Sequence, residues 1–128
     1  MRVLAAGLPH GIHGIHVHGV GRCDGPRFES AGSHWNPAVR KHGLSNAAGP
    51  HGGDLPNVTV AANGTLSATL TVPGASLTGP SGAPGSLLDG DGAALVLHAQ
   101  ADDNMTDPSG NSGDRIACAV LQPTTARY

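Results

Sequence analysis

Aromatic residues are nearly absent from this chain, which has one Trp, one Tyr and one Phe among its 128 residues. Its core must therefore be built mainly from Val, Leu, Ile and Ala. A core this light favours an additional staple, such as a disulfide or a bound metal. Twenty Gly and ten Pro predict many turns between short strands. The length predicts one domain, residues 1–128.

Three further absences exclude classes of function. The formal net charge is −2 and there is no run of Lys or Arg, so nucleic acid is not an expected partner. No apolar stretch approaches the length of a membrane span. The segment Met1–Leu8 is too short for a secretory signal peptide. Cys23 and Cys118 are too far apart for a C-x-x-C motif, so they are either two buried thiols or one disulfide.

No segment has a convincing helical period, whereas several short runs alternate or are apolar throughout. The turn Asn63-Gly64 lies between two alternating runs and predicts a hairpin. Short strands with closely spaced turns are typical of a β-sandwich or barrel. The predicted strands are Arg2–Leu8, Ile12–Val20, Asn57–Val60, Leu66–Val72, Ala93–His98 and Arg115–Leu121.

The stretch Gly11–Gly19 contains three histidines that alternate with Ile and Val. Residues two apart on a strand share a face, so His16 and His18 should project together while Val17 enters the core. Imidazole ligands suit copper and zinc, and this pair therefore predicts a metal site. His13 is expected to be structural, with hydrogen bonds to the backbone, and His10 is expected to be exposed.

Residues 21–55 show no regular period, although loops this long are uncommon in compact domains and are usually functional. We expect metal ligation and Cys23 to order this stretch. Its side chains His34, His42, His51 and Asp54 form an N3O set that suits tetrahedral zinc. His98 ends a predicted strand far along the chain and can join His16 and His18. Two metal sites are therefore predicted.

With these motifs in place, the chain closely resembles the copper/zinc superoxide dismutase family. The resemblance extends from about residue 7 to the C-terminus, in family order. The stretches that carry it are Gly14–His18, Ser30–Pro37, Lys41–Gly43, His51–Asn57, Val96–His98 and Gly110–Cys118.

The resemblance implies a Greek-key β-sandwich or barrel with two long functional loops, and it implies roles for individual residues. His16, His18, His34 and His98 would bind copper, and His34, His42, His51 and Asp54 would bind zinc, with His34 shared. Asp102 would link a copper-ligand histidine to a zinc-ligand histidine. Arg115 would be the active-site arginine, and Cys23 and Cys118 would form the family disulfide.

The chain departs from the family pattern in two places. Family members usually carry two further strands before the segment matching Arg2–Leu8, so the first hairpin is expected to be missing and one sheet to expose an edge. A homo-oligomer or a partner is expected to cover that edge. The loop between His98 and Arg115 lacks the Lys and Glu cluster of animal members, so substrate steering is expected to rest mainly on Arg115.

The expected function is therefore superoxide dismutation, in which copper cycles between two oxidation states and zinc is structural. His34 is expected to carry a proton to the departing peroxide. The alternative is a copper/zinc-binding module for storage or delivery with little or no turnover; an interaction domain would not need seven ligands. The implied disulfide favours an extracytoplasmic location, periplasmic or secreted.

Overall fold

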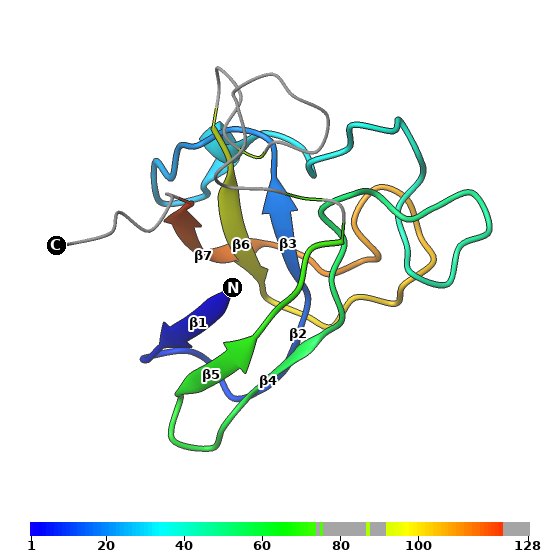
Figure 1. Ribbon diagram of the computed structural model, residues 1–128. Coiled ribbons are helices and arrows are strands. Elements are labelled where there is room, and N and C mark those ends of the chain that lie inside the picture. Colours follow the sequence, from blue (N-terminus) through cyan, green and yellow to red (C-terminus); the bar gives the residue numbers. More distant parts are fainter. Residues whose placement is uncertain (74, 76–86, 88–91, 122–128) are drawn as a thin grey trace, which may run out of the picture.

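The computed structural model describes residues 1–73, 75, 87 and 92–121. These residues form seven short strands and one 3-10 turn, η1 (Glu29–Ala31), so the predicted all-β class is confirmed (Figure 1). The sequence also predicts a loop over Pro73–Gly85, and this stretch lies almost entirely outside the described residues. The strands are β1 (Arg2–Ala5), β2 (Gly11–His13), β3 (Ile15–His18), β4 (Val58–Val60), β5 (Leu66–Thr69), β6 (Ala94–His98) and β7 (Arg115–Val120).

Three antiparallel sheets are formed by the described strands: β1 with β5, β2 with β4, and β3-β6-β7. In the third sheet β6 is central, with His16 opposite Val96 on one side and Val96 opposite Cys118 on the other. The β6–β7 register shifts between Leu97 and His98. Such a bulge re-aims side chains, here at the end of the strand that carries His98.

The single strand predicted over Ile12–Val20 is wrong, because Gly14 divides it into β2 and β3, which join different sheets. Gly14 donates its amide to Gln100 and accepts from the amide of His98. A Cβ at Gly14 would lie 3.0 Å from the Cβ of Ser112. The chain therefore changes sheets where the loop after β6 packs directly against its backbone.

The predicted hairpin at Asn63-Gly64 forms a turn but not a paired hairpin. The amide of Ala61 bonds to the carbonyl of Thr65, which closes the turn. The two flanking strands then separate, β4 to pair with β2 and β5 to pair with β1. The predicted turn is confirmed, but the predicted pairing of its two flanking strands is wrong. Strand pairing depends on long-range contacts that a local sequence pattern does not encode.

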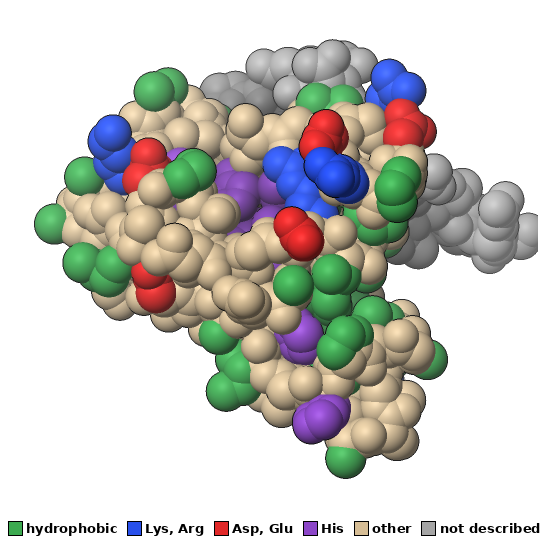
Figure 2. Space-filling view, turned by 180° about the vertical axis from the view of Figure 1, so that it is seen from behind, with side chains coloured by type: hydrophobic (Ala, Val, Ile, Leu, Met, Phe, Trp, Pro, Cys, Tyr) green, Lys and Arg blue, Asp and Glu red, His purple; other side chains and the backbone are tan. Residues whose placement is uncertain are grey.

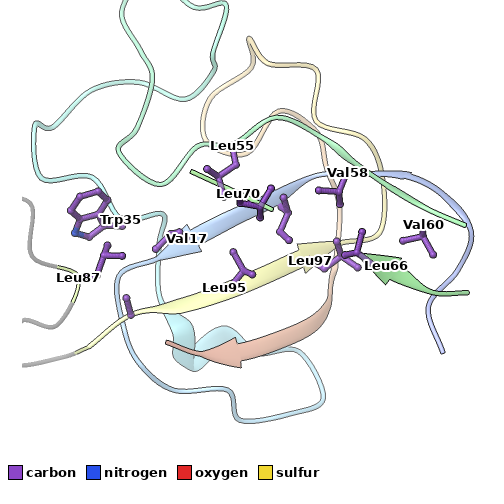
Figure 3. Packing of buried hydrophobic residues seen from close by; sticks show 12 residues of the cluster. Val17, Trp35, Leu55, Val58, Val60, Leu66, Leu70, Leu87, Leu95 and Leu97 are labelled. Carbon is purple, nitrogen blue, oxygen red and sulfur yellow. The ribbon is translucent and has the colours of Figure 1, made fainter. Parts of the chain in front are cut away.

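The core is aliphatic, as the composition requires, with Trp35 as its buried aromatic side chain among the described residues. Val17 of β3 lies opposite Leu95 of β6 and Ile15 lies opposite Leu97, while Trp35 packs at one end near Leu87 (Figure 3). Alternation holds in β3: Ile15 and Val17 join this core while the two histidines between and after them face the other side.

The long segment between β3 and β4 is ordered by more than metal ligands and Cys23. It runs beside the free edge of β3, where Trp35 and Gly53 hydrogen-bond to the backbone of Val17. Isolated bridges also pair His16 with Asp54 and His18 with His34. Trp35 and Leu55 are buried in the core. The expectation that metal ligation and Cys23 order this segment therefore leaves out the core contacts of Trp35 and Leu55.

A disulfide joins Cys23 to Cys118, with the two Cα atoms 5.7 Å apart, so the pairing implied by the family resemblance is confirmed. It ties the segment after β3 to β7. Among the described residues no helix is long and apolar enough to cross a membrane.

Among the described residues, β1 pairs only with β5 and β7 only with β6, so each of these two strands has one open edge. Between them lies an apolar cavity of about 240 Å³, lined by side chains of β1, β5, β6 and β7. Leu4 beside it is 68% exposed. Apolar side chains therefore lie beside these open edges among the described residues.

Candidate metal centre

Four histidines from three parts of the chain converge on one buried point. His16 and His18 come from β3, His98 from the end of β6, and His34 from the segment that runs beside β3. One ring nitrogen from each lies within 4.8 Å of the others. We refer to His16, His18, His34 and His98 as the four-histidine group.

The outer ring nitrogens of this group are held by acceptors. His18 Nδ1 donates to the carbonyl of Gly32 at 2.7 Å, and His98 Nδ1 lies 3.2 Å from the carbonyl of Gly113. Their inner nitrogens, with Nδ1 of His16, are buried without a hydrogen-bond partner. Unpartnered buried polar atoms cost about 1–3 kcal/mol each. Converging on one point, they fit a metal ion that would accept their lone pairs.

Burial keeps this group uncharged. It lowers the pKa of His18 to about 2 and those of His34 and His98 to about 4 each, because an imidazolium would lose its hydration there. Burial also lowers the pKa of His16, against the raising effect of its hydrogen bond to Asp102. At neutral pH the four rings are therefore already in the form that binds metal.

A second group shares His34 and is carried by the long segment. Its donor atoms again lie within 4.8 Å of one another. Nδ1 of His34 is 3.0 Å from Oδ1 of Asp54, and Nδ1 of His51 is 3.4 Å from the same oxygen. Zinc–nitrogen bonds of 2.0–2.1 Å in a tetrahedron place ligand atoms about 3.3 Å apart, close to these separations. We refer to His34, His42, His51 and Asp54 as the three-histidine–aspartate group.

Asp54 is oriented by backbone amides. Its Oδ2 accepts from the amides of Gly43 and His51, each at 2.9 Å, which leaves Oδ1 for the centre of the group. Nδ1 of His42 lies 2.8 Å from that Oδ1 but has no hydrogen-bond partner. The donor set and this inward-facing nitrogen fit a zinc ion.

The charges of this second group differ from those of the first. Burial opposes charge at His42, but its contacts with Asp102 and Asp54 outweigh burial and raise its pKa to about 9. Burial also opposes charge at Asp54, which by itself would raise the pKa of the carboxyl. The hydrogen bonds of Asp54 outweigh burial and hold that pKa far below the usual range. Without metal, this group therefore holds a charged carboxylate and a protonated ring at neutral pH.

Asp102 lies between the two groups. Its Oδ2 is 2.7 Å from Nε2 of His16 and 2.9 Å from Nε2 of His42. These contacts are hydrogen bonds to the outer nitrogens of two rings whose Nδ1 atoms face the two groups, so Asp102 joins a ring of one group to a ring of the other. Asn57 fixes Asp102 by bonding to both its backbone amide and its carbonyl. The linking role that the resemblance implies for Asp102 stays a prediction.

The four-histidine group opens into a cavity of about 580 Å³. Arg115, on β7 opposite His98, lines the cavity, and its Nη1 donates to the carbonyl of Phe28 at 2.9 Å. Figure 2 shows histidine surfaces in a hollow with Lys and Arg side chains around it.

Sequence reasoning missed three residues at this cavity. Arg40, Lys41 and Asp107 line it, although only Arg115 was expected to carry positive charge there. The position of Lys41 directly before His42 was the available signal. Asp107 had none, because its closeness to the long segment depends on how two loops pack.

The two remaining histidines lie as expected. His10 is exposed, and His13 is buried with Nδ1 2.8 Å from the carbonyl of His98 and Nε2 2.8 Å from that of Pro9. Neither belongs to a group that could hold a metal among the described residues. His13 instead holds the backbone of a ligand-bearing strand end.

Comparison with known proteins agrees with this geometry. A family model described as copper/zinc superoxide dismutase (SODC) matches residues 1–121. The chain belongs to the copper/zinc superoxide dismutase family. The family uses copper and zinc, and the two side-chain groups supply suitable ligands for both. The resemblance and the expected fold type are therefore confirmed.

Individual relatives are similar over most of the chain. It is 46% identical over 108 residues to the superoxide dismutase-like protein YojM of Bacillus subtilis (strain 168), covering 84% of this chain and 54% of that protein. Superoxide dismutase [Cu-Zn] 1 of Aquifex aeolicus (strain VF5) is 41% identical, with 95% and 72% covered. The chain thus spans about half the length of the first relative.

Solved structures show the same fold. The crystal structure of a superoxide dismutase-like protein from Bacillus subtilis superposes with a TM-score of 0.87 at 44% identity, covering 94% of this chain and 79% of that one.

Proposed function

We propose that this protein is a superoxide dismutase. The reaction converts two superoxide anions and two protons into one oxygen and one hydrogen peroxide. The supporting observation is a buried set of four converging imidazole nitrogens that opens into a cavity walled by an arginine. Copper at the four-histidine group would supply the one-electron exchange, because imidazole ligands suit copper. Zinc at the three-histidine–aspartate group has no redox chemistry.

Arg115 is proposed to receive the anionic substrate. Its guanidinium is held at the cavity wall by the carbonyl of Phe28, so its orientation is set in advance. Burial lowers its pKa and Glu29 opposes this, but a guanidinium stays protonated at any physiological pH. A fixed positive charge there attracts superoxide and positions it beside the four histidines.

His34 is proposed to hold and move a proton. Its Nδ1 lies among the donors of the three-histidine–aspartate group, which leaves Nε2 for the four-histidine group. A proton on Nε2 would lie on the side of the four-histidine group, at the cavity through which reaction products leave. Asp54 lies 3.0 Å from Nδ1 of His34 and would keep the imidazole ring in one orientation while Nε2 gains and loses the proton.

Arg40 and Lys41 add positive charge at the same cavity. Both come from the long segment, and Arg40 is anchored by bonds to the carbonyl of Gly49. The carboxylate of Asp107 also lines the cavity, so three cations stand there against one anion. A positive excess in a cleft raises the on-rate of anionic substrates, an effect for which superoxide dismutases are themselves a known case. Steering is therefore proposed to rest on three cations rather than on Arg115 alone.

The second candidate function is a copper/zinc-binding module with little or no turnover. It is favoured by one observation, namely that the relative from Bacillus subtilis is named only dismutase-like. Against it stands Arg115 at the cavity beside a complete four-histidine group, because storage of a metal requires the ligands but not a cation beside them.

Superoxide consumption after copper and zinc loading tests the two functions. We expect the loaded protein to consume superoxide faster than the same concentration of free copper. H98A should abolish this activity, whereas H10A should keep it, because His10 is exposed and belongs to neither group. A loaded protein no faster than free copper would support the binding module.

We further propose that residues 1–128 form a single domain that works outside the cytoplasm, where a disulfide such as Cys23–Cys118 persists. The apolar cavity between β1 and β7 is proposed to be covered in solution by a second copy or another chain. The molecular mass in solution and the redox state of the cysteines in cells check these proposals.

A further inference from the structure

Each metal-facing histidine other than His34 has an outer ring nitrogen that can donate a hydrogen bond, and all but one of these nitrogens have an acceptor in the described part of the chain. His16 and His42 contact Asp102, His18 contacts Gly32, and His98 contacts Gly113, all at 3.2 Å or less. His34 belongs to both groups and has no outer nitrogen to spare. Only His51 lacks a hydrogen-bond acceptor on its outer side among the described residues. Metal-binding histidines almost always donate that N–H to an outer acceptor.

Asp107 lies on the outer side of His51, just beyond hydrogen-bond distance. Nδ1 of His51 faces the three-histidine–aspartate group, so Nε2 points outward, and it lies 3.7 Å from Oδ1 of Asp107. The same oxygen accepts the backbone amide of His42 at 2.9 Å. One carboxylate oxygen of the loop after β6 thus faces two residues of this group. Among the described residues, no Lys or Arg nitrogen forms an ion pair with it.

We propose that Asp107 is a positioning residue for zinc, which orients and polarises the ring of His51 from outside while holding the backbone of His42. The proposal rests on the zinc assignment made above. The side chain of Asp107 is 44% exposed, so solvent screens its charge. Its effect on zinc affinity should therefore lie at the low end of the range for carboxylates that contact a metal ligand from outside. Bound zinc would favour the interaction further, because it makes Nε2–H a stronger donor.

The junction between the two loops does not depend on Asp107 alone. The amide of Ser45 bonds to the carbonyl of Asn104, and the side chain of Asn46 bonds to the carbonyl of Met105. Substitution of Asp107 should therefore leave the loops packed, and a loss of zinc affinity can be separated from unfolding.

The test compares D107N and D107A in copper-free protein. Asn keeps an oxygen that can accept the His42 amide but removes the negative charge, whereas Ala removes both. D114N is the control, because it removes the same charge from the same loop and Asp114 makes no side-chain hydrogen bond or ion pair among the described residues. The dissociation constant for the first equivalent of zinc is measured by chelator competition, and the visible spectrum of the cobalt(II)-substituted protein is recorded.

We expect D107N to weaken zinc binding by about tenfold and to shift the cobalt bands, while the melting temperature of the metal-free protein and the zinc affinity of D114N stay at wild-type values. A wild-type zinc affinity and cobalt spectrum in D107N would overturn the proposal. So would a loss confined to D107A, since it would assign the effect to the His42 amide. If the wild-type protein binds no zinc tightly, the zinc assignment itself fails instead.

Discussion

The four-histidine group and the three-histidine–aspartate group share His34 but are built differently. The first is borne mainly by β3 and β6 in the packed sheet, and its rings are kept neutral by burial. The second is borne by the long segment, and it includes a carboxylate and a ring whose pKa is raised to about 9. The strand-borne group is thus ready for metal, whereas the segment-borne group must release a proton first.

Removal of one ligand from each group should change metal affinity more than any other substitution considered. D54A should weaken zinc binding by more than about a hundredfold, since four ligands share the binding free energy of a structural zinc site. H18A should weaken copper binding similarly while zinc binding remains. Competition titrations with each metal measure both constants.

Asp54 also accepts two backbone amides, so D54A tests the architecture of the segment as well. If it lowered copper affinity as strongly as zinc affinity, the two groups would act as one unit. The contrast between a strand-borne and a segment-borne site would then be wrong.

The pH dependence of metal uptake should differ between the groups. Below pH about 9 the ring of His42 is protonated in the metal-free protein, and zinc must displace that proton. Zinc affinity should therefore rise by about tenfold per pH unit from pH 7 towards pH 9 and then level off. Titrations in buffers of different ionisation enthalpy would also show the proton released.

Copper uptake should show no such slope over the same range, because the pKa values of His18, His34 and His98 are lowered to about 2, 4 and 4. These depressed values predict a different effect on the metal-free fold. The contribution of these three neutral histidines to its stability is complete above pH 6.5 and falls as the pH drops towards 4, because the unfolded chain takes up protons first. Parallel slopes for both metals would contradict the assignment of charge.

The smallest effect is expected for Lys41. This residue lies in the long segment that carries the three-histidine–aspartate group, but it lines the cavity into which the four-histidine group opens. K41A should lower the superoxide consumption rate of loaded protein by about twofold and reduce its dependence on ionic strength. Zinc affinity should not change. Stopped-flow rates across a salt series measure this, and R2A is the matched control, because Arg2 is an exposed residue of β1 that does not line the cavity. An unchanged salt dependence in K41A would remove Lys41 from the steering set.

Much of the candidate site could be predicted from the amino-acid sequence, because its ligand residues are rare types at distinctive spacings. His16 and His18 share a face through the two-residue period of a strand, which is a local rule. The chain beside them was harder to predict. The division at Gly14 and the separation of β4 from β5 depend on backbone contacts with Gln100 and on pairing with β1 and β2.

The sequence by itself determined the all-β class, the alternation that buries Val17 while His16 and His18 face the metal centre, and the family to which the chain belongs. Only the tertiary structure decided how the long segment is ordered, which cations line the cavity, and that Asp107 lies against His51 and His42. The reason is physical. Side-chain type and local period are encoded within a few residues, whereas the proximity of residues 107 and 51 exists only after two loops pack on the same sheet.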